Sequence, residues 1–287
     1  MDKKNSEIKA LLQLLDDPNN EVFAQVAQRI LTEGDVIIPD LEKAWEMSLN
    51  EVLQERIENL IQEIQFTSTQ KQLIDWKENN STNLLTGAFL IAKYQYPDLK
   101  YDVLLESFNK IKQDAWLEIN NNLTALEKVR VLNHIFYQIH VFSGNSSNFF
   151  APQNSYINHV FESKKGNPLT LGIIYIALAQ ELNIPIYGVN MPRNFILAYV
   201  DEFNTENPYE DDVLFYINPY NKGTVLGKRE IDYFLKQQKM EPKDSYYKPC
   251  SNIQVIKKLI LNLVYSYEKL GYPDKVEGMK KLYEIMN

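Results

Sequence analysis

Apolar side chains recur at intervals of three and four residues through the first 65 positions, the spacing of amphipathic helices. The polar run at residues 16–20 ends the first predicted helix, and Gly34 ends the second. Pro39 stands where a first helical turn accepts proline, and a fourth helix follows from Asn50. The pattern predicts two helical hairpins. The side chains expected to face inward are Ile8, Leu11, Leu12, Leu15, Val22, Val26, Ile30, Val52, Ile57, Leu60, Ile61 and Ile64.

A short internal repeat accompanies these hairpins. Glu21-Val22 recurs as Glu51-Val52, in each case after a polar turn. The arrangement resembles the helical HEAT-type repeat, in which one hairpin cannot bury its apolar face alone and stacks on the next. We therefore expect HEAT-like helices over residues 1–66.

The helical period continues to residue 182 and then gives way to a period of two. Helices are predicted over residues 69–78, 83–94, 99–119, 123–140 and 169–182, with Asp98 and Thr124 as caps. Asn183 is expected in a left-handed conformation after the last of them. Strands follow at residues 186–190, 195–200 and 213–217, and helices return at residues 228–239, 252–270 and 273–286.

The predicted architecture is α+β, mostly helical, with a small antiparallel sheet and a C-terminal helical hairpin. The expected divisions are residues 1–66, 67–240 and 241–287. Two segments interrupt the regular elements: an aromatic, turn-rich loop at residues 142–152 and an acidic loop at residues 201–212. The aromatic side chains of the first loop are expected to pack inward as anchors.

Composition narrows the function classes. The 287 residues carry 30 basic and 38 acidic side chains, a formal charge of −8 that argues against a nucleic-acid partner. The longest apolar run is far shorter than a membrane helix, and the first residues lack the apolar core of a signal peptide, so we expect a cytoplasmic protein without a membrane partner. Cys250 is the sole cysteine, which excludes an internal disulfide and places a lone thiol on a predicted linker outside the core.

Candidate chemistry concentrates between residues 159 and 223. Asn167 and Pro168 open the apolar helix, Asn167 as its cap, and Thr170 falls in the first turn, where a cysteine would have a lowered pKa. Asn194 opens the second predicted strand and Asn218 closes the third. This order of helix, strand and strand is the one that the papain-like transglutaminase fold uses to assemble cysteine, histidine and aspartate.

Four ordered motifs sharpen the comparison. They are Asn154-Ser-Tyr-Ile-Asn158, Glu162-Ser-Lys-Lys-Gly-Asn-Pro-Leu-Thr-Leu-Gly172, Tyr187-Gly-Val-Asn-Met-Pro-Arg-Asn-Phe195 and Ile217-Asn-Pro-Tyr-Asn-Lys-Gly223. Over residues 125–240 the chain resembles the SirB-type bacterial family, a transglutaminase-like group with helical flanking segments. The resemblance implies a transglutaminase-like core with its nucleophile place at or near Thr170, its histidine place at Asn194 and its acid place at Asn218.

The residues at those places depart from the family pattern. Asparagine cannot take up a proton near neutral pH, so Asn194 cannot serve as a general base, and a threonine hydroxyl without a base is a poor nucleophile. We predict that the three side chains converge in space and that none is catalytic. Each also has a plain structural interpretation: Thr170 as a helix-terminus residue, Asn194 and Asn218 as turn residues.

Other polar residues suggest binding rather than catalysis. Lys164 and Lys165 beside the helix N-terminus are candidates for an anion contact, and a solvated pair is the plain alternative. With them, the predicted binding residues are Asn154, Asn167 and Arg193. His134 and His140 lie six residues apart, off the spacing of a helical metal pair, and His159 is distant in sequence, so neither a metal nor a cofactor is expected.

Three functions compete at this point. The favoured one is a catalytically inactive transglutaminase-like scaffold or binding module for a peptide or protein. The alternatives are a cysteine-independent hydrolase or transferase using the same cleft, and an adaptor acting through the N-terminal helices.

Overall fold

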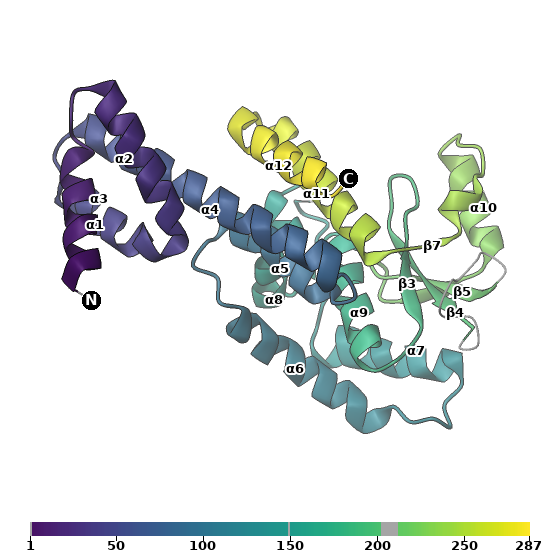
Figure 1. Ribbon diagram of the computed structural model, residues 1–287. Helices are drawn as coiled ribbons and strands as arrows, with labels where there is room; N and C mark the ends of the chain where they lie inside the picture. The colour runs from purple at the N-terminus through teal and green to yellow at the C-terminus, as the bar shows by residue number, and fades with distance from the viewer. Residues whose placement is uncertain (1, 149, 202–211) are drawn as a thin grey trace. The chain divides into compact units, whose positions relative to one another are not determined.

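The computed structural model describes residues 2–148, 150–201 and 212–287. It divides into two compact units, Met1–Leu73 and Ile74–Asn287. Figure 1 shows a mostly helical chain with one small antiparallel sheet, which confirms the predicted fold class. Within the described ranges, no helix has both the length and the apolar character that crossing a membrane requires.

The first unit contains α1 (Asp2–Leu14), α2 (Asn20–Glu33), α3 (Ile38–Met47) and most of α4 (Glu51–Asn79). Its core confirms the helical pattern, because the buried cluster includes Ile8, Leu15, Val26, Ile30, Ile57, Leu60 and Ile64. The prediction was wrong for Val52, whose surface is 58% exposed near the start of α4. The packing in this unit is that of helical hairpins, and the HEAT-like interpretation stays a prediction.

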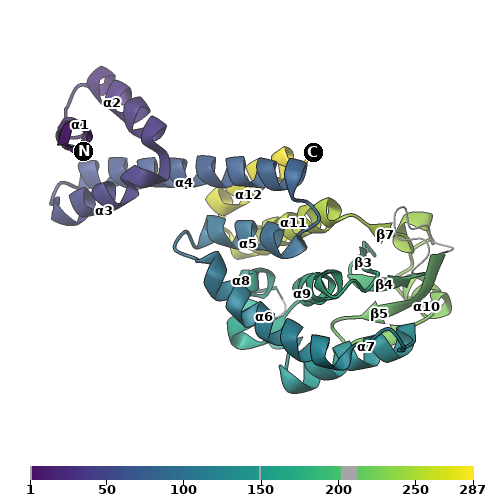
Figure 2. The same cartoon turned by 60° about the horizontal axis from the view of Figure 1, so that its bottom comes forward.

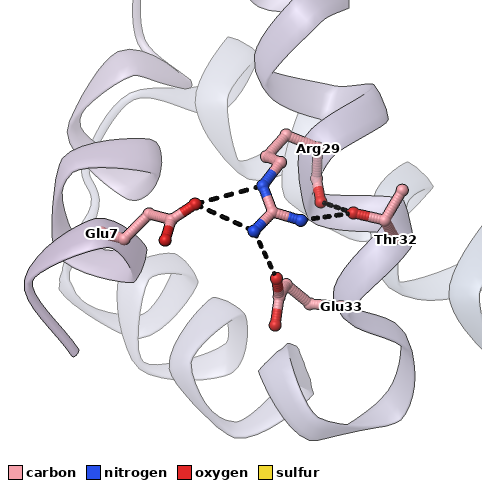
Figure 3. Close-up of polar contacts among 4 residues, drawn as sticks. All are labelled: Glu7, Arg29, Thr32 and Glu33. Carbon is pink, nitrogen blue, oxygen red and sulfur yellow. Dashed lines mark hydrogen bonds and ion pairs between the residues drawn. The ribbon is translucent and has the colours of Figure 1, made fainter. Parts of the chain in front are cut away.

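An ion-pair network ties α1 to α2 on the surface of this unit (Figure 3). The Arg29 guanidinium donates to Glu7 Oε1 through Nε and Nη2, at 3.1 and 2.9 Å, and pairs with Glu33 at 2.9 Å. Its Nη1 also donates to Thr32 Oγ1 at 2.8 Å. Exposed ion pairs of this kind contribute little to stability, so the buried apolar cluster contributes most of the stability of this unit.

Helix α4 corrects a predicted break near residue 68. The segment between Gln65 and Thr69 contains no glycine or proline, and the Thr69 hydroxyl donates to the Gln65 carbonyl at 2.9 Å. That local bond lets a β-branched polar residue remain inside a helix. The two predicted helices are therefore one.

The second unit consists of a sheet surrounded by helices. The helices are α5 (Leu84–Gln95), α6 (Tyr101–Glu118), α7 (Ala125–Asn133), α8 (Ile157–Ser163), α9 (Pro168–Glu181), α10 (Lys228–Gln237), α11 (Asn252–Leu270) and α12 (Pro273–Ile285). The sheet has the order β6-β5-β4-β3-β7, with all neighbours antiparallel. Its strands are β3 (Ile186–Val189), β4 (Ile196–Val200), β5 (Val213–Asn218), β6 (Thr224–Leu226) and β7 (Pro249–Cys250).

Helix α9 lies at the centre of the unit. Every residue from Leu169 to Ala179 is buried, as expected of a helix that is apolar on all sides. Figure 2 shows it between α5, α8 and α11 and the strands β3 and β4, all of which it contacts. The opposite face of the sheet packs on α10, so alternate residues of β4 are buried on both sides: Leu197 near α9, and Ile196 and Ala198 toward α10.

Local sequence signals predicted most helix ends correctly. Thr124 forms a capping box with Glu127, and Asn183 has a positive φ of 55°. Asp98 was a wrong prediction, because α6 begins at Tyr101 with Lys100 in the cap position. The helix predicted to reach residue 140 is α-helical only as far as Asn133. It continues as a π-helical turn over His134–Ile139.

The aromatic loop and the linker also differ in part from expectation. Phe142 is buried and stacks on Phe136, with ring centroids 4.4 Å apart, as predicted, whereas Phe150 is 55% exposed. Phe149 and most of the acidic loop, residues 202–211, lie outside the described residues. Cys250 does not lie on a linker, because it belongs to strand β7 and pairs with Gly188 of β3.

Candidate functional site

The N-terminus of α9 is built around Asn167, as predicted. Its Oδ1 accepts the backbone N–H of Thr170 at 2.9 Å, and the Thr170 hydroxyl donates to the same oxygen at 3.2 Å. Pro168 fills the first turn. Thr170 has no exposed surface. The hydroxyl at the predicted nucleophile place therefore completes a helix cap and does not reach solvent.

The remaining polar atoms of this end join the loop before α8. Asn167 Nδ2 donates to Ser155 Oγ at 2.8 Å. Asn154 is buried, donates to the Asn148 carbonyl at 2.6 Å and accepts from Asn145 Nδ2 at 2.8 Å. Two of the predicted binding residues, Asn154 and Asn167, thus hold the second part of the aromatic loop against α9.

A two-stranded parallel pair secures the first part of the same loop. β1 (Ser143–Gly144) pairs with β2 (Lys165–Gly166), directly before Asn167. A Cβ atom at Gly144 would overlap the ring of Tyr220, so only glycine allows this approach. The contact brings the turn after Asn218 next to the strand pair that leads into α9.

Asn218 organises the turn between β5 and β6. Its Oδ1 accepts the backbone N–H groups of Tyr220 and Asn221, at 3.0 and 3.1 Å, the geometry of an Asx turn. The Tyr137 hydroxyl donates to the Pro219 carbonyl at 2.8 Å, and burial raises the pKa of Tyr137 far above its ordinary value. The side chain at the predicted acid place is therefore a turn former.

Asn133 connects that turn to α9. Its Nδ2 donates to the Gly223 carbonyl at 2.9 Å, and its Oδ1 accepts from the Tyr175 hydroxyl of α9 at 3.0 Å. Gly223 has a φ of 69°, and a Cβ atom there would overlap the Asn133 amide. This bridge fixes the last of the four motifs to the central helix.

Asn194 ends the turn between β3 and β4. Its Oδ1 accepts the N–H of Phe195 at 2.8 Å, and its backbone N–H donates to the Met191 carbonyl at 3.3 Å. Arg193 is exposed, has a φ of 57° and donates to Gln238 at 3.0 Å. The side chain at the predicted histidine place is thus bound to its own turn.

The ring of Phe195 joins this turn to α9. A Cβ atom at Gly172 or at Gly188 would lie 2.7 or 2.6 Å from ring carbons of Phe195. Two motif glycines therefore make room for one motif phenylalanine. The start of β4 consequently packs on the second turn of α9.

Lys258 of α11 holds the same turn from the other side. Its Nζ donates to the carbonyls of Met191 and Asn194, each at 3.0 Å, and to Asn190 Oδ1. The ammonium also lies 5.8 Å from the centre of the Phe195 ring. Nothing in the sequence pattern singled out this lysine, because its partners lie more than sixty residues earlier in the chain.

Burial alters the pKa of two groups at this point. It lowers the pKa of Lys258 from 10.5 to about 8, although the nearby Cys250 acts in the opposite direction. It raises the pKa of Cys250 from 9.0 to about 12. Because the thiol stays protonated at neutral pH, Cys250 is a poor nucleophile where it stands.

The structure brings together the segments that carry the three predicted places, through Phe195 on Gly172 and Tyr220 on Gly144. The side chains at those places use their polar atoms locally. Among the described residues, none of Thr170, Asn194 and Asn218 exchanges a hydrogen bond with another of the three. Their convergence into one cleft stays a prediction.

Of the predicted basic pair, Lys164 lies against aromatic rings. Lys164 has a φ of 58°, and its ammonium lies 4.6 Å from the centre of the Phe142 ring, while burial lowers its pKa. Lys165 is exposed. The side chain of Lys164 therefore packs over the loop anchor, and the anion contact stays a prediction.

The three histidines have separate surroundings. His134 bonds to Gln138 at 3.0 Å, His140 bonds to Asp114 at 2.7 Å, and the His159 ring packs edge-on against Tyr96. In the described part of the chain, no three histidine, cysteine, aspartate or glutamate side chains cluster as a metal site would require.

Comparison with known proteins identifies the family to which this chain belongs. Residues 103–261, more than half of the chain, match the model of the transglutaminase-like superfamily, and the chain belongs to that superfamily. A UPF0162 protein of Xylella fastidiosa is 33% identical over 157 residues, which is 54% of this chain and 52% of that protein. No solved structure shows a significant match.

More distant relatives share the same region. A UPF0162 protein of Vibrio cholerae is 24% identical over 156 residues, 54% of each chain. Mouse F-box only protein 21 is 25% identical over 155 residues, 54% of this chain and 23% of the mouse protein. The chain spans about half the length of the bacterial relatives it matches.

Proposed function

We propose that this transglutaminase-like protein has no transfer or hydrolytic activity and acts as a module that binds a peptide or protein. The main support is the burial of Thr170, whose hydroxyl donates to the cap residue Asn167. A nucleophile needs a base within hydrogen-bond reach and access to substrate. Asn194 and Asn218 supply no base and serve their own turns.

Two further observations support a binding role. The framework that positions the motifs is intact, with Asn133, Tyr137 and Tyr175 bonded across three elements. The matched region also occupies 23% of F-box only protein 21, so it exists there as one part of a larger protein. A unit that has this framework and no reacting groups would be suited to recognition.

The finer assignments rest on the sequence and belong to the same proposal. They are membership of the SirB-type family, residue divisions at 66 and 240, a cytoplasmic location, a protein or peptide partner, and no nucleic-acid partner or cofactor.

The activity is tested by following incorporation of a fluorescent primary amine into a glutamine-rich acceptor protein, together with release of ammonia. We expect no turnover above buffer. Turnover that Thr170→Ala abolishes, while circular dichroism reports an unchanged fold, would instead support the alternative of a cysteine-independent transferase.

The accessibility of the nucleophile place is tested with a thiol reagent. In a Cys250→Ala background, Thr170→Cys should react at least about 100-fold more slowly than Lys165→Cys at an exposed position, because buried thiols are inert. Lys165→Cys is the matched control, five residues away. Equal rates would mean that the first turn of α9 opens to solvent, and the proposal would lose its main support.

One observation favours the N-terminal adaptor as a second candidate. Three apolar side chains around the turn from α3 to α4 are exposed: Met47 at 86%, Leu49 at 100% and Val52 at 58%. Adjacent exposed apolar side chains are typical of interaction sites. A partner that loses affinity for Leu49→Ser, and not for changes within residues 74–287, would favour this candidate.

A further inference from the structure

Two lysines from distant parts of the chain lie close together in the second unit. Lys110 is exposed on α6, and Lys164 is half-buried at the end of α8. The two helices contact each other, as Figure 2 shows. Burial lowers the pKa of Lys164, and the positive charge of Lys110 lowers it further. Two like charges therefore stand near each other, which is unfavourable unless an anion compensates them.

The Lys164 side chain is held in place. Its backbone has a left-handed conformation, with a φ of 58°, and its carbonyl accepts the N–H of Ser143 at 2.8 Å. Its ammonium lies 4.6 and 5.7 Å from the ring centres of Phe142 and Phe161, which are both buried. Aromatic rings attract an ammonium but do not neutralise it. The charge of Lys164 thus has a fixed position and no counter-ion from these rings.

The carboxylates on the same two helices do not neutralise the lysines. On α6, Asp114 pairs with His140 at 2.7 Å. On α8, Glu162 lies 3.8 Å from His159. Within the residues that the structure describes, neither of these acids nor Glu106 forms an ion pair with either lysine. Partly buried charges in proteins are usually paired, so this pair of cations lacks its expected partner.

Strained backbone lies directly beside the two lysines. Val141 has a φ of 52°, which is rare for a β-branched residue, and it follows the π-helical turn His134–Ile139. Both π-helical turns and strain of this kind concentrate at functional sites. Val141 also precedes Phe142, the ring on which Lys164 packs. The side chains of Ile139 and Val141 are 53% and 60% exposed, so apolar surface borders the cationic pair.

We propose that Lys110 and Lys164 together bind one oxyanion, a carboxylate or a phosphate, between α6 and the end of α8. Two ammonium groups supply charge-assisted hydrogen bonds to such a group. The site differs from the anion contact expected from the sequence, because Lys110 takes the place of Lys165 and the N-terminus of α9 is not used. It does not depend on the binding function proposed above.

The probe is inorganic phosphate, at an ionic strength held constant with sodium chloride. The readout is the rate at which single lysines of the full chain are acetylated by an N-hydroxysuccinimide ester, measured by mass spectrometry. A bound anion favours the unreactive ammonium form. Phosphate should therefore slow the acetylation of Lys110 and Lys164 by at least about threefold, with one half-saturation concentration for both. Lys165 should keep its rate.

A variant tests whether the two lysines act together. Lys110→Met should abolish the effect of phosphate on the acetylation rate of Lys164, because one of the two charges is gone. Lys112→Met is the matched control and should leave that effect unchanged. It removes the same charge from another face of α6, where Lys112 pairs with Glu181 at 2.9 Å. If Lys110→Met does not fold, the shared half-saturation concentration in wild type still decides the question.

Two further probes identify the source of the anion. N-acetylglutamate N-methylamide presents a carboxylate on a peptide unit, and N-acetylglutamine N-methylamide is its uncharged control. Protection by the glutamate derivative at lower concentrations than phosphate would assign the site to an acidic side chain of a protein partner. The reverse order would assign it to a free phosphate compound. Either order supports the site, provided that the glutamine derivative gives no protection.

The remaining outcomes overturn the inference. Equal slowing at Lys165 would mean general screening or an anion at the N-terminus of α9. Protection of Lys164 that survives Lys110→Met would mean that the two lysines do not share a ligand. Absence of protection by every probe would exclude the anion site and leave the proposed function standing, because binding of a peptide does not require a charged contact.

Discussion

Lys258 makes the stability of the second unit depend on pH in a direction that can be measured. Its ammonium is surrounded by carbonyl oxygens of the β3–β4 turn and by the ring of Phe195, and burial lowers its pKa to about 8 from 10.5. Between these two values the unfolded chain binds more protons at this position than the folded chain. The contribution of Lys258 to the free energy of unfolding must therefore rise with pH in that window.

The size of the effect follows from the two pKa values. A difference of about 2.5 units, at about 1.36 kcal/mol each, gives a total near 3 kcal/mol once the pH exceeds the unfolded value. Between pH 7 and pH 9 the same relation yields about 1 kcal/mol. Cys250 acts in the opposite sense, because its raised pKa lowers stability as the pH rises above 9.0. Because Lys258 itself lowers the pKa of Cys250, wild type and variant are compared in a Cys250→Ala background, which removes this contribution from both.

The assay compares wild type with Lys258→Met by urea denaturation at pH 7, 8 and 9. Both carry Trp45→Phe, so that the remaining tryptophans, Trp76 and Trp116, report on the second unit alone. Wild type should gain about 1 kcal/mol relative to Lys258→Met across this range. Lys257→Met is the control. It removes a lysine side chain from the preceding position, where the ammonium lies over the ring of Tyr283.

Parallel stability curves for wild type and Lys258→Met would refute this reasoning. They would mean that Lys258 has the same pKa in the folded and the unfolded chain. Its three hydrogen bonds would then raise the pKa by as much as burial lowers it. A fall in wild-type stability relative to the variant would reverse the sign and imply an ammonium stabilised by the turn.

Two further predictions concern the framework. Asn167→Ala should lower the free energy of unfolding by about 1–2 kcal/mol, because it removes the side-chain oxygen that accepts the Thr170 N–H. Asn167→Asp should lower it by less, because its carboxylate still accepts that bond. Thermal and urea denaturation of the two variants test the difference. Gly223→Ala should cost more than about 1 kcal/mol, because φ is 69° and the added Cβ meets the Asn133 amide. If Gly223→Ala costs nothing in an Asn133→Ala background, the cost comes from that overlap, whereas an equal cost in both backgrounds would come from the backbone.

Features encoded in a few adjacent residues could be predicted from the sequence. The caps at Asn167 and Thr124 and the helix end at Gly34, whose φ is 65°, each depend on neighbours within three or four positions. The inward faces of the first helices depend on a period that continues over many residues. The period failed for Val52, because the adjacent Leu53, and not Val52, packs against the apolar cluster.

Features that depend on distant partners could not be predicted. The strands β6 and β7 have three and two residues, too few for a periodic signal, and exist because β5 and β3 offer edges to pair with. Lys258 was missed for the same reason, since it contacts a turn that lies far earlier in the chain. Cys250 appeared to lie on a linker until the pairing with Gly188 placed it in the sheet.

The three predicted catalytic places fall where regular elements begin or end: the first turn of α9, the turn before β4 and the end of β5. A fold that gathers reacting groups puts them at such ends, where backbone N–H groups lack partners. Here the side chains of Asn194 and Asn218 accept such N–H groups, and the Thr170 hydroxyl donates to the Asn167 oxygen that accepts another. Other contacts hold these elements in place. Asn133 bonds to Gly223 and Tyr175, and the Phe195 ring packs on Gly172 and Gly188. Substitution at the catalytic places can therefore leave the fold intact, so a match to the family motifs reports on the framework and carries no information about activity.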